Sequence, residues 1–217
     1  EKFDSVKLWQ IRQIPGVTGV VTTLYDIPAG EVWPIERIKA LQEEVREAGL
    51  EIAGIESVNI HDTIKIGSEE REKYIDNYIE TLDNLGQCGI KLVCYNFMPV
   101  FDWTRTDLAK VRPDGATVLA YDQKVVDTID PQTFFDQTND NSNGFVMPGW
   151  EPERLAKVKE LFKAYESVDE DTLFNNLVYF LKRIQGVCEK WGIKMAIHPD
   201  DPAWPVFNLP RIITSKE

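Results

Sequence analysis

Short apolar runs alternate with amphipathic stretches along this chain, which is the pattern of repeated strand–helix units. The runs are β-branched and apolar over most of their length. Strands of this kind suit a parallel sheet whose two faces are both buried, so we expect such a sheet. The predicted strands are residues 16–22, 51–58, 90–97 and 193–197.

The amphipathic stretches between these runs predict helices. Pro34–Ala48 begins with a proline, which the first helical turn tolerates, and Gly49 follows as a stop signal. Glu69–Leu85 repeats apolar residues at helical spacing. Glu153–Trp191 is too long for one ordinary helix, and we expect a break near Ser167-Val168-Asp169.

One segment, residues 99–150, interrupts this rhythm. It contains the turn signal Pro113-Asp114-Gly115 and a polar tract at 137–144. A connection of this length far exceeds the usual few-residue loop after a strand. It predicts a lid or a contact between subunits, and the alternative is a tolerated surface insertion. We assign residues 1–217 to a single domain.

The composition excludes some classes of protein. The formal net charge of −12 disfavours nucleic acid as a partner, because phosphate contacts need clustered Lys and Arg. No apolar run is long enough to span a bilayer, so we expect no membrane segment. Cys88, Cys94 and Cys188 are widely spaced and suit reduced thiols. With no signal-peptide pattern at the start, these cysteines predict a cytoplasmic protein.

Polar side chains follow the ends of the second, third and fourth predicted strands. Carboxyl ends of parallel strands open onto the ligand site of α/β proteins, so we expect these residues to converge. Arg offers a fork to a carboxylate, and Asn or Asp can bind hydroxyls, so the set suits a small polyhydroxylated acid. The predicted substrate-binding residues are Glu56, His61, Asn96, Arg105, Asp200 and Asp201.

His198 is the predicted metal ligand. It follows the strand 193–197 directly and begins the segment His198-Pro199-Asp200-Asp201-Pro202. Neutral imidazole is a common metal ligand, and carboxylates can join it or support it. The alternative is a structural histidine followed by an ordinary turn. The sequence has no G-x-S-x-G motif of serine hydrolases. It also lacks a Walker motif and a G-x-G-x-x-G motif, which disfavours nucleotide and dinucleotide chemistry.

Several of these segments resemble a known family. Val93–Val100, Asp102–Leu108 and Ile197–Pro202 are similar to the mannonate dehydratases of the bacterial hexuronate pathway. The likeness runs over essentially the whole sequence. Further matching segments are Gly19–Thr22, Glu56–Val58, His61-Asp62, Asn84–Ile90 and Leu209–Ile212.

The resemblance implies a TIM (β/α)8 barrel of the sugar-isomerase type, of which about half the βα units are present here. It implies a lyase that dehydrates D-mannonate to 2-keto-3-deoxy-D-gluconate through a metal-stabilised enediolate, with Mn2+, Fe2+ or another divalent ion. His198 matches a metal ligand of the family. The other ligands and the catalytic acid and base are expected on strands absent from this sequence, so the catalytic residues stay unknown.

A homo-oligomer is also expected. Two other hypotheses stay open: a metal-dependent isomerase or epimerase of the same barrel type, and a non-catalytic fragment that serves as a binding module.

Overall fold

A computed structural model describes residues 5–128 and 158–216 of the chain. These residues form two compact units. The first comprises Glu1–Phe97 and Glu170–Pro199, and the second comprises Met98–Asp169 and Asp200–Glu217.

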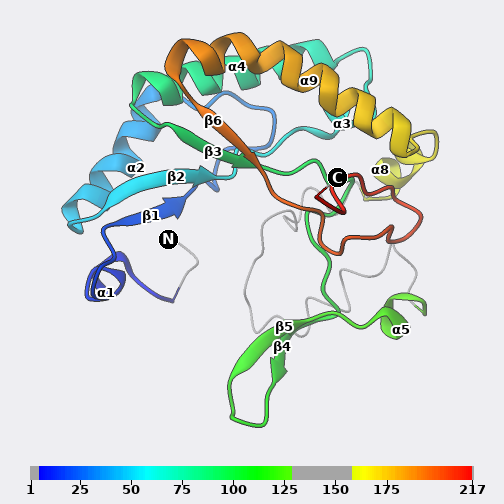
Figure 1. Cartoon of the computed structure of the whole chain (residues 1–217), viewed down its shortest axis with the longest axis horizontal. Coiled ribbons are helices and arrows are strands. Elements are labelled where there is room, and N and C mark those ends of the chain that lie inside the picture. Colours follow the sequence, from blue (N-terminus) through cyan, green and yellow to red (C-terminus); the bar gives the residue numbers. More distant parts are fainter. Residues whose placement is uncertain (1–4, 129–157, 217) are drawn as a thin grey trace. The chain divides into compact units, whose positions relative to one another are not determined.

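The first unit is built on a four-stranded parallel sheet of order β1-β2-β3-β6. All four predicted strands are confirmed, each shorter than the sequence indicated. Helices α2, α4 and α9 lie along one face of this sheet (Figure 1). The elements of this unit are α1 (Leu8–Ile11), β1 (Gly19–Thr22), α2 (Ile35–Glu47), β2 (Glu51–Glu56), α3 (Asp62–Ile66), α4 (Arg71–Gln87), β3 (Leu92–Tyr95), α9 (Glu170–Trp191) and β6 (Lys194–Ile197).

The two faces of the sheet differ in burial. Ile55 and Val93 are neighbours in the strand register and are fully buried, and Tyr95, on the same side, contacts Phe180 of α9. Val21 lies on the alternate side of its strand and is 51% exposed. In the described residues the face that carries the helices holds the fully buried side chains, and the opposite face is partly exposed, so the prediction that both faces are buried is not confirmed.

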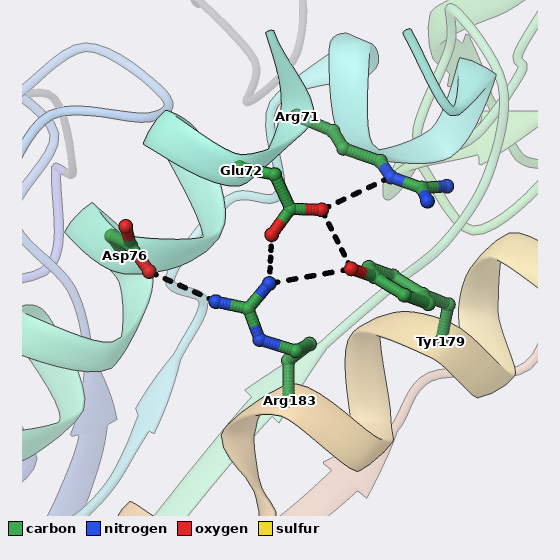
Figure 2. Close-up of polar contacts among 5 residues, drawn as sticks. All are labelled: Arg71, Glu72, Asp76, Tyr179 and Arg183. Carbon is green, nitrogen blue, oxygen red and sulfur yellow. Dashed lines mark hydrogen bonds and ion pairs between the residues drawn. The ribbon is translucent and has the colours of Figure 1, made fainter. Parts of the chain in front are cut away.

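Helices α4 and α9 pack against each other through an apolar seam and a polar cluster. Phe180 is fully buried and meets Tyr78 edge to face, with ring centroids 5.0 Å apart. On the outer side, Glu72 accepts hydrogen bonds from Tyr179 and Arg183, and Asp76 also accepts from Arg183 (Figure 2). Arg71 lies over the ring of Tyr179, 3.9 Å from its centroid. These contacts join the N-terminal end of α4 to the middle of α9.

The second unit contains the start of the long connection after β3. Its elements are β4 (Asp107–Val111), β5 (Thr117–Ala120), α5 (Gln123–Val126) and α8 (Val158–Tyr165). Strands β4 and β5 form an antiparallel hairpin around the predicted turn at Pro113-Asp114-Gly115. The break near 167–169 is confirmed, because α8 ends at Tyr165 and α9 begins at Glu170. Residues 129–150 of the predicted lid lie outside the described residues.

Candidate active site

In the first unit, predicted site residues come from adjacent strand ends. Glu56 is in register with Cys94, and Cys94 with Ala196. The amide of His198 donates to the carbonyl of Tyr95 at 2.7 Å, which extends the β3–β6 ladder. Because side chains alternate along a strand, Glu56, Asn96 and His198 all project from the face that the helices do not cover. The sequence placed these three residues at one end of the sheet, and the structure agrees.

Cys94 lies on the same face, in register with Glu56 and Ala196. Burial, and then the charge of Glu56, raise the pKa of the Cys94 thiol, which keeps it protonated at neutral pH. Among the described residues, no group of three or more His, Cys, Asp or Glu side chains is close enough to hold a metal ion. A complete set of metal ligands is therefore not assembled within the described residues, and His198 is the candidate ligand that the sequence predicted.

The imidazole of His198 is held in a form that suits metal binding. Its Nδ1 lies 2.6 Å from the carbonyl oxygen of Pro199. A carbonyl can only accept, so Nδ1 carries the proton and the lone pair is on Nε2. The ring is exposed. Metal-binding histidines commonly donate their other ring N–H to a backbone carbonyl in this way, so His198 fits one ligand position.

His61 has a different environment. It is the N-cap of α3, where its Nδ1 accepts from the amide of Thr63 at 3.3 Å. Its ring stacks on Tyr74 with centroids 3.8 Å apart and planes within 2°. Gly30 packs so closely here that a Cβ would lie 2.5 Å from the Tyr74 ring. These contacts indicate that His61 fixes the start of α3 and packs against Tyr74 and the loop that contains Gly30.

In the second unit, Arg105 and Asp201 come together. The guanidinium of Arg105 donates to both carboxylate oxygens, at 2.9 and 2.6 Å. The backbone also joins them, because the amide of Thr104 donates to the carbonyl of Asp201 at 3.2 Å. The fork that we expected to bind a substrate carboxylate is thus occupied by a carboxylate of the chain itself.

Asp200 is buried and bound to backbone. Its Oδ2 accepts from the amides of Ile212 and Ile213, at 2.7 and 3.0 Å, and its side chain is 4% exposed. Beside it lies Arg211, 2% exposed, whose Nη2 donates to the carbonyl of Phe101 at 3.4 Å. Burial lowers the pKa of Arg211, and the charges of Asp200, Asp102 and Asp201 oppose this.

Sequence reasoning missed Arg211, although a signal was present. An arginine between Leu209-Pro210 and Ile212-Ile213 stands in an apolar segment, where a charge needs an opposite charge beside it. Its partner could not be identified, because the carboxylates come from two other loops.

Comparison with known proteins identifies the family. The sequence profile described as D-mannonate dehydratase (UxuA) matches residues 1–217, the whole chain. The chain belongs to the D-mannonate dehydratase family. The resemblance noted in the sequence is thereby confirmed.

Individual members of this family are closely similar. The chain is 66% identical over 217 residues to a protein of Brachyspira hyodysenteriae named mannonate dehydratase, and 56% identical to one of Thermotoga maritima with the same name. It matches the crystal structure of mannonate dehydratase from Streptococcus suis with a TM-score of 0.84 and 43% identity over 99% of the chain. An α/β fold with a parallel sheet is therefore confirmed.

The family members are longer than this sequence. The chain spans 61% of the Brachyspira protein, 60% of the Thermotoga protein and 55% of the Streptococcus chain.

Proposed function

We propose that the protein to which these residues belong dehydrates D-mannonate to 2-keto-3-deoxy-D-gluconate and water. The observation that carries this proposal is the 66% identity, over all 217 residues, to a protein named mannonate dehydratase. The matched region spans the strand ends as well as the core, because it runs over the whole chain. The geometry of His198 supports it independently.

The sheet is proposed to be one part of a (β/α)8 barrel. An arc of such a barrel would carry helices on one face and a less buried opposite face. It would also end in two edge strands, as this sheet does at β1 and β6 among the described residues. In a closed barrel the row Glu56, Asn96 and His198 would face the interior at the carboxyl ends of the strands. That is where barrel enzymes bind their substrates.

His198 is proposed to bind a divalent ion, Mn2+ or a similar metal, through Nε2. When bound, such an ion supplies Lewis-acid stabilisation of negative charge on the substrate oxygens as the proton at C2 is removed. Dehydration then needs a proton for the departing C3 hydroxyl. Further ligands would be required, because no group of three or more His, Cys, Asp or Glu side chains is close enough to hold the ion among the described residues.

Apart from His61, which caps α3, the other predicted residues divide into two groups. Glu56 and Asn96 project from the same face as His198 and are proposed to bind substrate hydroxyls. Asp200 already accepts two backbone hydrogen bonds through Oδ2, and Arg105 and Asp201 bind each other. For these three residues we favour a role in shaping the loops.

A reducing cytoplasm and a homo-oligomeric assembly are also proposed. The three cysteines are free thiols, which suits a reducing compartment. Over the described residues, no helix combines the length and apolar character needed to cross a bilayer.

The test uses the protein isolated at its natural length. Formation of the 2-keto acid from D-mannonate is measured with Mn2+ and after chelation. We compare the wild type, His198→Gln and a control, Asp122→Ala, whose carboxylate caps the short helix α5. Metal-dependent dehydration that His198→Gln abolishes and Asp122→Ala retains would support the proposal.

Two outcomes would overturn it. Turnover of neutral sugars with none of aldonic acids would indicate an isomerase or epimerase instead. A folded protein with neither turnover nor affinity for Mn2+ would indicate a non-catalytic binding module.

A further inference from the structure

The peptide group between Pro199 and Asp200 is hydrogen-bonded at both ends. Its carbonyl oxygen accepts from Nδ1 of His198 at 2.6 Å, and its N–H, that of Asp200, donates to the carbonyl of Ile213 at 2.9 Å. A peptide group is planar and rigid. Any rotation of this plane would therefore lengthen both hydrogen bonds, so what holds the Asp200 end also fixes the acceptor of the His198 ring.

The side chain of Asp200 strengthens that end. Its Oδ2 accepts from the amides of Ile212 and Ile213, so three hydrogen bonds join Asp200 to these two residues. Together they close the loop between Asp200 and Ile212. At 4% exposure, the carboxylate is largely screened from water, where such bonds are strong.

Arg211 supplies the charge that this buried carboxylate needs. It precedes the two amides bound by Asp200, is 2% exposed, and interacts electrostatically with Asp200 and Asp102. Four side-chain atoms in this cluster are buried and make no hydrogen bond within the described residues. They are Nε and Nη1 of Arg211, Oδ1 of Asp200 and Oγ1 of Thr104. A buried carboxylate without an adjacent cation would be costly, and removal of the cation would destabilise the loop.

We propose that Asp200 and Arg211 are positioning residues for His198: they lock the Pro199–Asp200 peptide, which orients the imidazole and keeps the proton on Nδ1. This leaves Nε2 aimed and unprotonated for a divalent cation. The effect on cation affinity rests on the proposed metal-binding role of His198. The tautomer itself is a property of the metal-free protein.

His61 provides an internal reference. Its Nδ1 accepts from the amide of Thr63 at 3.3 Å and lies 2.9 Å from the Thr63 hydroxyl, which can donate to it as well. These contacts favour the proton on Nε2, the opposite tautomer to that of His198. Ring nitrogens with and without a proton differ widely in 15N chemical shift. Long-range 1H–15N spectra of the metal-free protein at about pH 8, above the ordinary histidine pKa of about 6.5, separate the two forms.

The experiment compares Asp200→Ala, Asp200→Asn and Arg211→Met in the protein at its natural length. Wild-type His198 should show the Nδ1–H form. In Asp200→Ala and Arg211→Met we expect a mixture of tautomers and a loss of Mn2+ affinity of about 10- to 100-fold, the usual effect of removing a group that orients a metal ligand. Asp200→Asn keeps one acceptor oxygen and should lose less. Asp122→Ala, which removes an exposed capping carboxylate, should change neither measurement.

The outcomes separate the two proposals. If the folded variants keep a pure Nδ1–H tautomer and wild-type Mn2+ affinity, the positioning role is wrong; if Asp200→Ala does not fold, Asp200→Asn and Arg211→Met decide. If wild-type His198 shows the Nδ1–H form and the variants disturb it, but no Mn2+ binds, the positioning stands and the proposed function fails.

Discussion

Arg105 and Asp201, 96 residues apart, form a two-pronged ion pair with Nη1–Oδ1 and Nη2–Oδ2 distances of 2.9 and 2.6 Å. Their side chains are 19% and 36% exposed. The pair joins the segment after β3 to the loop after β6, both within the second unit. It therefore holds in place two of the loops whose residues the sequence assigned to a binding site.

Breaking this pair should destabilise the second unit. We expect a coupling energy of about 1 kcal/mol from the double-mutant cycle of Arg105→Met and Asp201→Asn, measured as the free energy of unfolding in urea. Arg105→Lys should recover only part of it, because an ammonium cannot reproduce the fork. Additive single-variant effects would show that the two side chains do not interact in solution.

Two helical glycines should respond oppositely to alanine. A Cβ at Gly86 of α4 would lie 2.2 Å from the ring of Trp191, whereas a Cβ at Gly186 of α9 would meet nothing within 4 Å. Gly86→Ala should destabilise the protein by about 1–3 kcal/mol through overpacking. Gly186→Ala should stabilise it by about 0.5–1 kcal/mol through helix propensity. Thermal unfolding of both variants tests this, and a destabilised Gly186→Ala would contradict the open space beside it.

The polar cluster between α4 and α9 should contribute modestly to stability. Arg183→Met removes the contacts with Glu72 and Asp76 shown in Figure 2 and should cost about 1 kcal/mol, less at high salt. Arg46→Met is the matched control, because Arg46 pairs with Glu43 within α2, where both side chains are exposed, and its loss should change little. Equal effects for the two arginines would argue against a stabilising network.

Stability should fall at high pH because of Tyr95. Burial raises the pKa of Tyr95 to about 12, whereas an unfolded tyrosine has a pKa of about 10. The neutral phenol is favoured in the folded state, so this contribution is fully present below about pH 10 and is lost as the pH rises towards 12. By about pH 11 the loss should be near 1 kcal/mol, and Tyr95→Phe should reduce it. Urea unfolding of both proteins between about pH 8 and pH 11 measures the difference; identical pH profiles would contradict it.

The amino-acid sequence by itself determined the local structure. The spacing of apolar residues predicted the four parallel strands, α2 and α4, and the break before α9, because periodicity is a local consequence of strand and helix geometry. It also placed Glu56, Asn96 and His198 at strand ends, which in a parallel sheet meet at one edge. The segments quoted from the chain were enough to predict the family.

Only the tertiary structure decided how those residues are used. His61 and His198 both follow strands, yet one caps a helix and stacks on Tyr74 while the other donates to Pro199, because each tautomer depends on neighbours that only folding supplies. Arg105 and Asp201 were predicted to bind a ligand, and the structure shows that they bind each other. Arg211 gained its role from carboxylates on separate loops, a long-range electrostatic relationship that no local pattern encodes.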